Sequence, residues 1–223
     1  MEFRILDIFC GAGGFSAGFE QNQNFKTKIA VDIDKFVLET FKFNFPEAKI
    51  INGDIRENIT KNEIIKLSKK LKINMIIGGP PCQGFSLKGK QLGLQDPRNF
   101  LFLEFIELVN KIKPEIFVIE NVKNLIYCSN GYFIKEIQEK FSNMGYIVNF
   151  GILNAKDFGV PQNRERAIII GSLNKFIDLP ISHKPKNITI HDAISDLNYL
   201  ESGEGEFESN YIIIKQQIIL YLL

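Results

Sequence analysis

The chain has 223 residues, of which 45% are hydrophobic and 24% are charged, a composition typical of one large globular domain. Its formal net charge of +1 excludes a strongly basic surface, so any contact with nucleic acid must come from local patches or from a partner. The three cysteines are widely spaced and fit neither a disulfide framework nor a metal site, which predicts a reducing, cytoplasmic setting. No signal peptide and no membrane-spanning segment is expected.

Apolar segments of strand length alternate with amphipathic segments of helix length along most of the chain. Strands are expected at 3–9, 28–31, 49–51, 73–77 and 115–120, and helices from about 15 and at 34–45, 60–71, 100–112 and 132–144. This alternation predicts a mostly parallel sheet with helices on both faces. Two further strands, at 146–153 and 166–170, follow each other without a helix and predict an antiparallel hairpin at one edge of the sheet.

A glycine-rich turn, CGAGG, links the first expected strand to the first helix. Glycines there let the backbone turn tightly and approach a ligand closely, although Ser16 stands where the dinucleotide fingerprint has its last glycine. Asp32 ends the second strand, where an acidic side chain accepts hydrogen bonds from ribose hydroxyls, and Asp54 follows the third. Together these features predict an adenosine-bearing cofactor, with a packing turn and a turn-capping role for Asp54 as the alternatives.

Cys82 lies in GGPPCQGFS, directly after the fourth expected strand. Its preceding prolines fix two backbone φ angles, and a thiol at the carboxyl end of a parallel strand lies beside the cofactor crevice. We therefore predict a nucleophile at Cys82 rather than a small buried side chain, and assign Cys10 and Cys128 to the buried class.

Three charged side chains lie at the ends of later strands. Glu120 closes the apolar strand IFVIE and is followed by Asn121, and partial desolvation suits such a carboxyl to hold or donate a proton. Arg164 and Arg166 alternate with a glutamate in QNRER, so an extended backbone points both arginines to one face. A turn acid at 120 and a solvated strand edge at 164–166 are the alternatives.

Taken together, DIFCGAGGF, GDI, GGPPCQGFS, ENVKN and QNRER resemble the DNA (cytosine-5) methyltransferases in order and spacing over residues 3–198. The resemblance implies a Rossmann-like, three-layer α/β/α fold dependent on S-adenosylmethionine. It also implies methylation of carbon 5 of cytosine in double-stranded DNA, in a bacterial restriction-modification system, with the cytosine flipped out of the duplex.

The same resemblance implies roles for individual residues. Cys82 would add to carbon 6 of the cytosine ring, and Glu120 would stabilise charge at ring nitrogen 3. Arg164 and Arg166 would orient the base, and Asn121 would hold the loop and Glu120. The implied cofactor residues are Phe9, Gly11, Gly13, Gly14, Phe15, Asp32, Ile33, Asp54, Ile55, Pro80 and Leu101. The implied DNA contacts, in a lid over 83–99, are Gln83, Ser86, Lys88, Lys90 and Arg98.

The end of the chain departs from the family pattern. Residues 1–200 are expected to form the catalytic domain and 201–223 an irregular tail, without the family's target-recognition region or its final Gly-Asn motif. A frameshifted or prematurely stopped gene, one subunit of a split enzyme and a tolerated minimal form are the three hypotheses, in that order. The functional alternatives are an inactive nucleotide-binding fragment, a transfer-RNA cytosine methyltransferase and, more remotely, a nicotinamide-dependent oxidoreductase.

Overall fold

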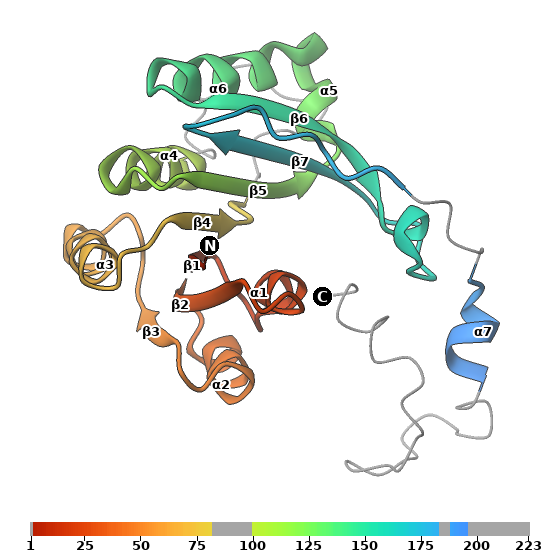
Figure 1. Ribbon diagram of the computed structural model, residues 1–223, viewed down its shortest axis with the longest axis horizontal. Helices are drawn as coiled ribbons and strands as arrows, with labels where there is room; N and C mark the ends of the chain where they lie inside the picture. The colour runs from red at the N-terminus through yellow and green to blue at the C-terminus, as the bar shows by residue number, and fades with distance from the viewer. Residues whose placement is uncertain (1, 82–99, 183–187, 196–223) are drawn as a thin grey trace.

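The computed structural model describes residues 2–81, 100–182 and 188–195. Within these ranges, strands form one sheet in the order β3-β2-β1-β4-β5-β7-β6 (Figure 1). The strands are β1 (Phe3–Ile8), β2 (Phe25–Asp32), β3 (Lys49–Asn52), β4 (Met75–Gly78), β5 (Ile116–Val122), β6 (Ile147–Asn154) and β7 (Glu165–Ser172). The helices are α1 (Gly14–Glu20), α2 (Lys35–Asn44), α3 (Asn58–Lys70), α4 (Phe100–Ile112), α5 (Asn124–Tyr127), α6 (Tyr132–Asn143) and α7 (Ile190–Ile194), with 3-10 turns η3 (Cys128–Gly131) and η4 (Ala155–Phe158).

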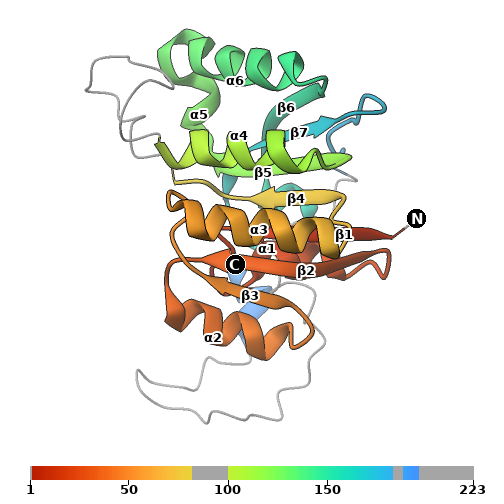
Figure 2. The ribbon, with the colours of Figure 1, turned by 90° about the vertical axis from the view of Figure 1, so that its left-hand side faces the viewer.

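The sheet is mixed, as expected from the sequence. β1 to β5 pair in parallel, whereas β7 is antiparallel to both of its neighbours, β5 and β6. The predicted edge hairpin is therefore confirmed, with its second strand inserted between the first and the parallel sheet. α3, α4 and α6 cover one face of the sheet and α1 lies on the other (Figures 1 and 2). This is the Rossmann-like α/β arrangement that the sequence predicted.

Alternation along β1 divides the core between these two faces. Leu6 and Ile8 join the large cluster under α3, α4 and α6, and Ile5 joins a smaller cluster with the aromatic residues of α1. Such a two-sided strand is typical of a parallel sheet, because helices bury both of its faces. Asp7 lies on the α1 face with Ile5, and there it is 1% exposed.

The turn into α1 requires glycine at position 13. Gly13 precedes the helix with φ +100°, a left-handed conformation that side chains rarely adopt. A Cβ there would also lie 2.5 Å from a ring carbon of Phe45, which packs on Phe41 of α2. The glycine thus lets α1 start close to α2, immediately after β1.

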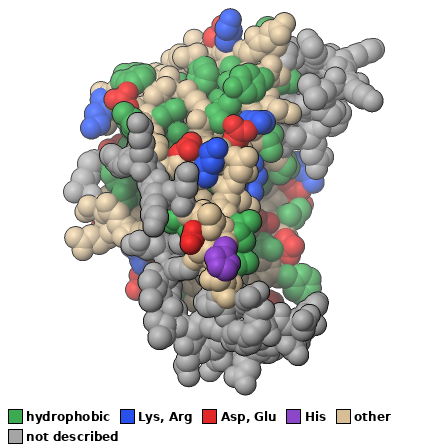
Figure 3. All heavy atoms as spheres, turned by 90° about the vertical axis from the view of Figure 1, so that its right-hand side faces the viewer, with side chains coloured by type: hydrophobic (Ala, Val, Ile, Leu, Met, Phe, Trp, Pro, Cys, Tyr) green, Lys and Arg blue, Asp and Glu red, His purple; other side chains and the backbone are tan. Residues whose placement is uncertain are grey.

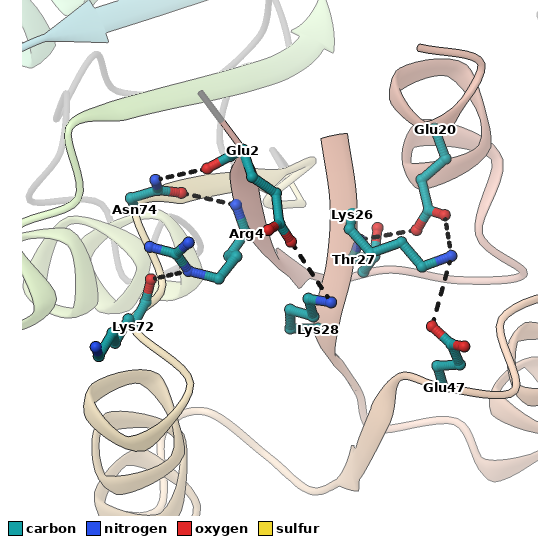
Figure 4. A network of polar contacts seen from close by, with 9 residues as sticks. All are labelled: Glu2, Arg4, Glu20, Lys26, Thr27, Lys28, Glu47, Lys72 and Asn74. Atoms are coloured by element: carbon teal, nitrogen blue, oxygen red, sulfur yellow. Dashed lines mark hydrogen bonds and ion pairs between the residues drawn. The ribbon is translucent and has the colours of Figure 1, made fainter. Parts of the chain in front are cut away.

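A polar network ties the amino ends of the strands together (Figure 4). The Asn74 side chain accepts a hydrogen bond from the Arg4 backbone N–H at 2.7 Å and donates to the Glu2 carbonyl at 3.1 Å. The Arg4 Nε donates to the Lys72 carbonyl at 2.7 Å. These bonds join the start of β1 to the segment before β4, so this edge is fixed by its own side chains.

The structure adds elements that the sequence pattern did not predict. β2 begins at Phe25 rather than 28, and the short elements α5, η3, η4 and α7 were not expected. Elements of four or five residues carry too little hydrophobic periodicity to be seen in a sequence. In the described ranges no helix is both long and apolar enough to cross a membrane.

Candidate active site

The carboxyl ends of β1 and β4 mark the point where the order of the sheet reverses. From β1 the chain proceeds to β2 and β3 on one side, and then returns to β4 on the other. In open α/β sheets ligands bind in the crevice outside the strands at such a point. The predicted cofactor and catalytic residues that the structure describes lie at or near this carboxyl edge. Three of them, Phe15, Ile55 and Leu101, pack into or against the core.

The glycine turn is fixed to β2. Phe9, with φ +64°, donates its N–H to the Val31 carbonyl at 2.9 Å. The Gly11 N–H donates to Asp32 Oδ2 at 2.9 Å, and the other carboxylate oxygen accepts from the Asp34 N–H at 3.0 Å. Gly11 has φ +52° and no heavy atom within 4 Å of where its Cβ would be. Asp32 therefore holds open a turn that a ligand can approach at backbone distance.

Asp7 is a buried acid directly beneath this turn, and sequence reasoning missed it. Its Oδ2 accepts a hydrogen bond from Ser16 Oγ of α1 at 2.7 Å, while its Oδ1 has no hydrogen-bond partner in the described part of the chain. Burial raises the pKa of Asp7 to about 7, and the Asp32 charge adds to the increase. Burial likewise raises the pKa of the nearby Cys10 thiol, consistent with the predicted buried class. A polar residue inside the apolar run FRILDIF was the available signal.

The remaining cofactor candidates lie in different environments. Asp54 forms a two-point ion pair with Arg56, with Nε–Oδ2 at 2.8 Å, and this hydrogen bonding lowers the pKa of Asp54. Ile33 is 65% exposed beside Asp32, so it is free to contact a ligand. Ile55, by contrast, is 3% exposed and belongs to the main core. Leu101 and Phe15 also pack against core clusters, and Gly14 is the first residue of α1.

Glu120 and the two arginines come together at the same edge. Because β7 is antiparallel to β5, its first residues lie beside the last residues of β5, with Arg166 opposite Val122. Arg166 Nε lies 2.7 Å from Glu120 Oε1, and a terminal nitrogen of Arg164 lies 3.9 Å from the same oxygen. All three side chains are about one-third exposed, so this charged group is open to a ligand from solvent.

Asn121 connects this group to the turn that precedes Cys82. Its Nδ2 donates to the Pro80 carbonyl at 2.8 Å, and its Oδ1 accepts from the Val122 N–H at 2.9 Å. A Cβ on Gly79 would lie 3.4 Å from Glu120 Oε2, so the turn passes close to the carboxylate. Asn121 thus holds the end of β5 against the end of β4.

Several predicted residues fall outside the described part of the chain. They are the predicted nucleophile and the predicted DNA contacts, Cys82, Gln83, Ser86, Lys88, Lys90 and Arg98. The described chain stops at Pro81 and resumes at Phe100, at the start of α4. In the described residues no group of three or more histidine, cysteine, aspartate or glutamate side chains is arranged to hold a metal ion.

A polar groove of about 400 Å³ adjoins Glu120. It is lined by Val122, Lys123, Asn124, Gln162, Asn163, Arg164, Glu165 and Arg166. Asn154, which sequence reasoning missed, supports its wall, because Asn154 Oδ1 accepts the Arg164 N–H at 3.1 Å and Nδ2 donates to Asn163 at 2.7 Å. Positive and negative side chains lie close together on the α1 side of the molecule (Figure 3), in keeping with the net charge of +1.

Comparison with known proteins gives the family. The model of the C-5 cytosine-specific DNA methylases matches residues 3–219. The chain belongs to this family. It is 41% identical to the type II methyltransferase M.AquIA of Picosynechococcus, over 88% of this chain and 90% of that protein. It is also 40% identical to M.XorII of Xanthomonas oryzae, over 94% of this chain but 50% of the relative.

Solved structures agree with the family assignment. An E. coli prophage protein, assigned as a DNA modification methyltransferase, has a TM-score of 0.72 at 31% identity, over 86% of this chain and 54% of its own. DNMT2 of Spodoptera frugiperda has a TM-score of 0.63 at 27% identity, over 83% of this chain and 56% of its own. This C-5 cytosine methylase chain therefore spans about half the length of these two structures and of M.XorII, and nearly all of M.AquIA.

Proposed function

We propose that the protein transfers a methyl group from S-adenosylmethionine to carbon 5 of cytosine in double-stranded DNA, as part of a bacterial restriction-modification system. The observation that carries the proposal is the Glu120–Arg166 pair, 2.7 Å apart, beside the Pro80 turn that leads to Cys82. A carboxyl group and a guanidinium held at this edge suit the ring of a cytosine, which offers an acceptor nitrogen, a carbonyl oxygen and an amino group.

In the proposed reaction the Cys82 thiolate forms a bond to carbon 6 of the flipped base. Electron density moves to carbon 5, while Glu120 in its acid form donates a hydrogen bond to ring nitrogen 3 and the arginines stabilise the developing charge. Carbon 5 takes the methyl group as its bond to the donor sulfur breaks. A base then removes the proton from carbon 5, the Cys82–carbon bond breaks, and the thiolate and the aromatic ring are restored.

The glycine turn and its neighbours suit S-adenosylmethionine, which supplies the methyl group when bound. The space over Gly11 admits a ligand close to the backbone, and Ile33 offers an exposed apolar surface next to Asp32. Asp32 would orient the ribose in addition to holding Gly11.

The test is covalent trapping. The protein is incubated with S-adenosylmethionine and duplex DNA that contains 5-fluorocytosine, which blocks the final proton removal and leaves the adduct in place. We expect a denaturant-resistant adduct with the wild-type protein and none with Cys82→Ala. An adduct on structured RNA but not on DNA would instead favour a transfer-RNA methyltransferase. Failure to trap either nucleic acid, with cofactor binding intact, would contradict the proposed activity for this chain.

We also propose that a second polypeptide supplies the target-recognition region. The relatives support this proposal, because the chain matches 90% of M.AquIA, a relative of similar length, but only 50% of M.XorII, which is about twice as long. The test is to co-express the chain with the product of the adjacent gene. Co-purification and sequence-specific methylation by the pair are expected, and equal site-specific methylation by the chain alone would contradict the proposal.

A further inference from the structure

Glu165 lies between the two arginines of QNRER in the sequence, but its side chain points to the opposite face of the sheet. We propose that Glu165 is a positioning residue, held by Lys123 on the reverse face of the sheet so that Arg166 stays in contact with Glu120. This inference deepens the proposed function, since it concerns how the arginines of that site are kept in place.

The register of β5 and β7 separates the two pairs of side chains. Glu120 lies opposite Ile168 and Val122 lies opposite Arg166, and residues directly opposite each other in a sheet share a face. Side chains alternate between faces along each strand. Glu120 and Arg166 therefore lie on one face and Glu165 on the other, and Lys123, the first residue after β5, reaches Glu165 with its side chain.

Lys123 and Glu165 meet beyond the last paired residues of these strands. The pairing of β5 with β7 ends at Val122 and Arg166, and one residue further on Lys123 Nζ lies 2.6 Å from Glu165 Oε2. Hydrogen bonding to this carboxylate raises the pKa of Lys123, and the bond to Lys123 lowers the pKa of Glu165. The ion pair thus extends the contact between β5 and β7 by one residue beyond the last backbone-paired residues.

The opposite side of β7 is held independently. β6 pairs with β7 as far as Asn154 and Glu165, and the Asn154 side chain accepts the Arg164 N–H at 3.1 Å. Towards β5, the start of β7 is held by the Lys123–Glu165 pair at 2.6 Å and by the longer Arg164–Glu120 contact at 3.9 Å. Strand ends fray first, so loss of this pair frees the start of β7 to move away from β5. Such a movement lengthens the 2.7 Å distance between Arg166 Nε and Glu120 Oε1.

Hydrogen exchange of the arginine Nε–H groups tests this without requiring activity. The chain has five arginines, so each Nε–H signal in an NMR spectrum can be assigned with single Arg→Lys variants. Arg4 is the internal reference, since its Nε also lies 2.7 Å from an oxygen, the Lys72 carbonyl at the far edge of the sheet. We expect Arg166 Nε–H to exchange several-fold faster in Glu165→Gln and Lys123→Met, with Arg4 unchanged.

The chain offers a matched control for the lysine substitution. Lys111 forms a 2.6 Å ion pair with Glu107 on α4 and is 47% exposed, against 2.6 Å and 49% for Lys123. Lys111→Met should leave the exchange of Arg166 Nε–H unchanged. Lys123→Arg keeps the positive charge, so its exchange should be as slow as in the wild type. A combined Lys123→Met/Glu165→Gln variant should exchange no faster than either single variant, because both remove the same contact.

The outcomes separate this inference from the proposed activity. Unchanged Arg166 exchange in both single variants, or an equal increase in Lys111→Met, would overturn the positioning role. If the wild-type protein forms the 5-fluorocytosine adduct, Glu165→Gln should slow adduct formation several-fold with the KM for S-adenosylmethionine unchanged. A wild-type protein that forms no adduct counts against the proposed function, while the exchange measurement still decides the role of Glu165.

Discussion

The buried carboxyl group of Asp7 makes the stability of the protein depend on pH in a direction opposite to that of most acids. Burial raises the pKa of Asp7 from 3.8 to about 7 in the folded protein, although the Ser16 hydrogen bond opposes the increase. Between these two values the folded protein binds a proton that the unfolded chain has released. The contribution of Asp7 to the free energy of unfolding is therefore fully retained below about pH 4 and falls as pH rises towards 7.

The size of this effect follows from the two pKa values. Each pKa unit corresponds to about 1.4 kcal/mol, so the gap between 3.8 and about 7 amounts to a loss on the order of 4 kcal/mol above pH 7. Asp7→Asn keeps the shape of the side chain and a hydrogen bond to Ser16 but carries no charge. The variant should match the wild type near pH 4 and exceed its stability by a few kcal/mol at about pH 8.

Urea unfolding of both proteins at a series of pH values between about 4 and 8 measures this difference directly. Other titrating groups are common to the two proteins, so their contributions largely cancel in the comparison. Ser16→Ala removes the hydrogen bond that opposes the increase, so the fall in its stability should continue to a higher pH than in the wild type. A constant difference between Asp7→Asn and the wild type across the whole range would refute the assignment of a raised pKa.

Three further substitutions test packing and the site. Gly171→Ala should cost about 1–3 kcal/mol or more in urea unfolding, because its Cβ would lie 2.1 Å from the buried ring of Phe117. Gly18→Ala, in α1 with no heavy atom within 4 Å of the new Cβ, should instead stabilise by about 0.5–1 kcal/mol, and a loss there would contradict the packing description. Arg166→Lys should slow adduct formation by about two orders of magnitude with little change in melting temperature, since lysine cannot reproduce the guanidinium contact to Glu120; a wild-type rate would exclude that contact from catalysis.

Much of the architecture was predictable because it is encoded locally. Alternating apolar and amphipathic segments predicted β1 to β5 and their helices, and two consecutive strands predicted the β6–β7 hairpin. The insertion of β7 beside β5 was not predictable, because it depends on contacts between segments about 50 residues apart. Asn154 was missed for a different reason: its partners in QNRER lie 9 and 10 residues further on, and the turn that brings them back was not predicted.

The candidate site shows a similar division. Motif order placed Glu120, Arg164 and Arg166 in one functional group, and the structure brings these three side chains together. The contacts between individual side chains of the site were not evident from the sequence. Alternation along QNRER already points Glu165 away from the arginines, and only the structure shows that Lys123 is its partner. The role of Cys82, outside the described ranges, remains a prediction.

The antiparallel direction of β7 is what makes this site possible. In a parallel sheet every strand begins at the amino edge, where Asn74 and Arg4 form the network that fixes the strand starts. β7 has eight residues, and at about 3.3 Å per residue a parallel β7 would place Arg166 some 20–25 Å from the end of β5. Reversal of this one strand brings its first residues to the carboxyl edge beside Glu120. Parallel strands place only their carboxyl-terminal residues, and the loops that follow them, at this edge. The hairpin therefore adds two arginines from the start of a strand to the same edge.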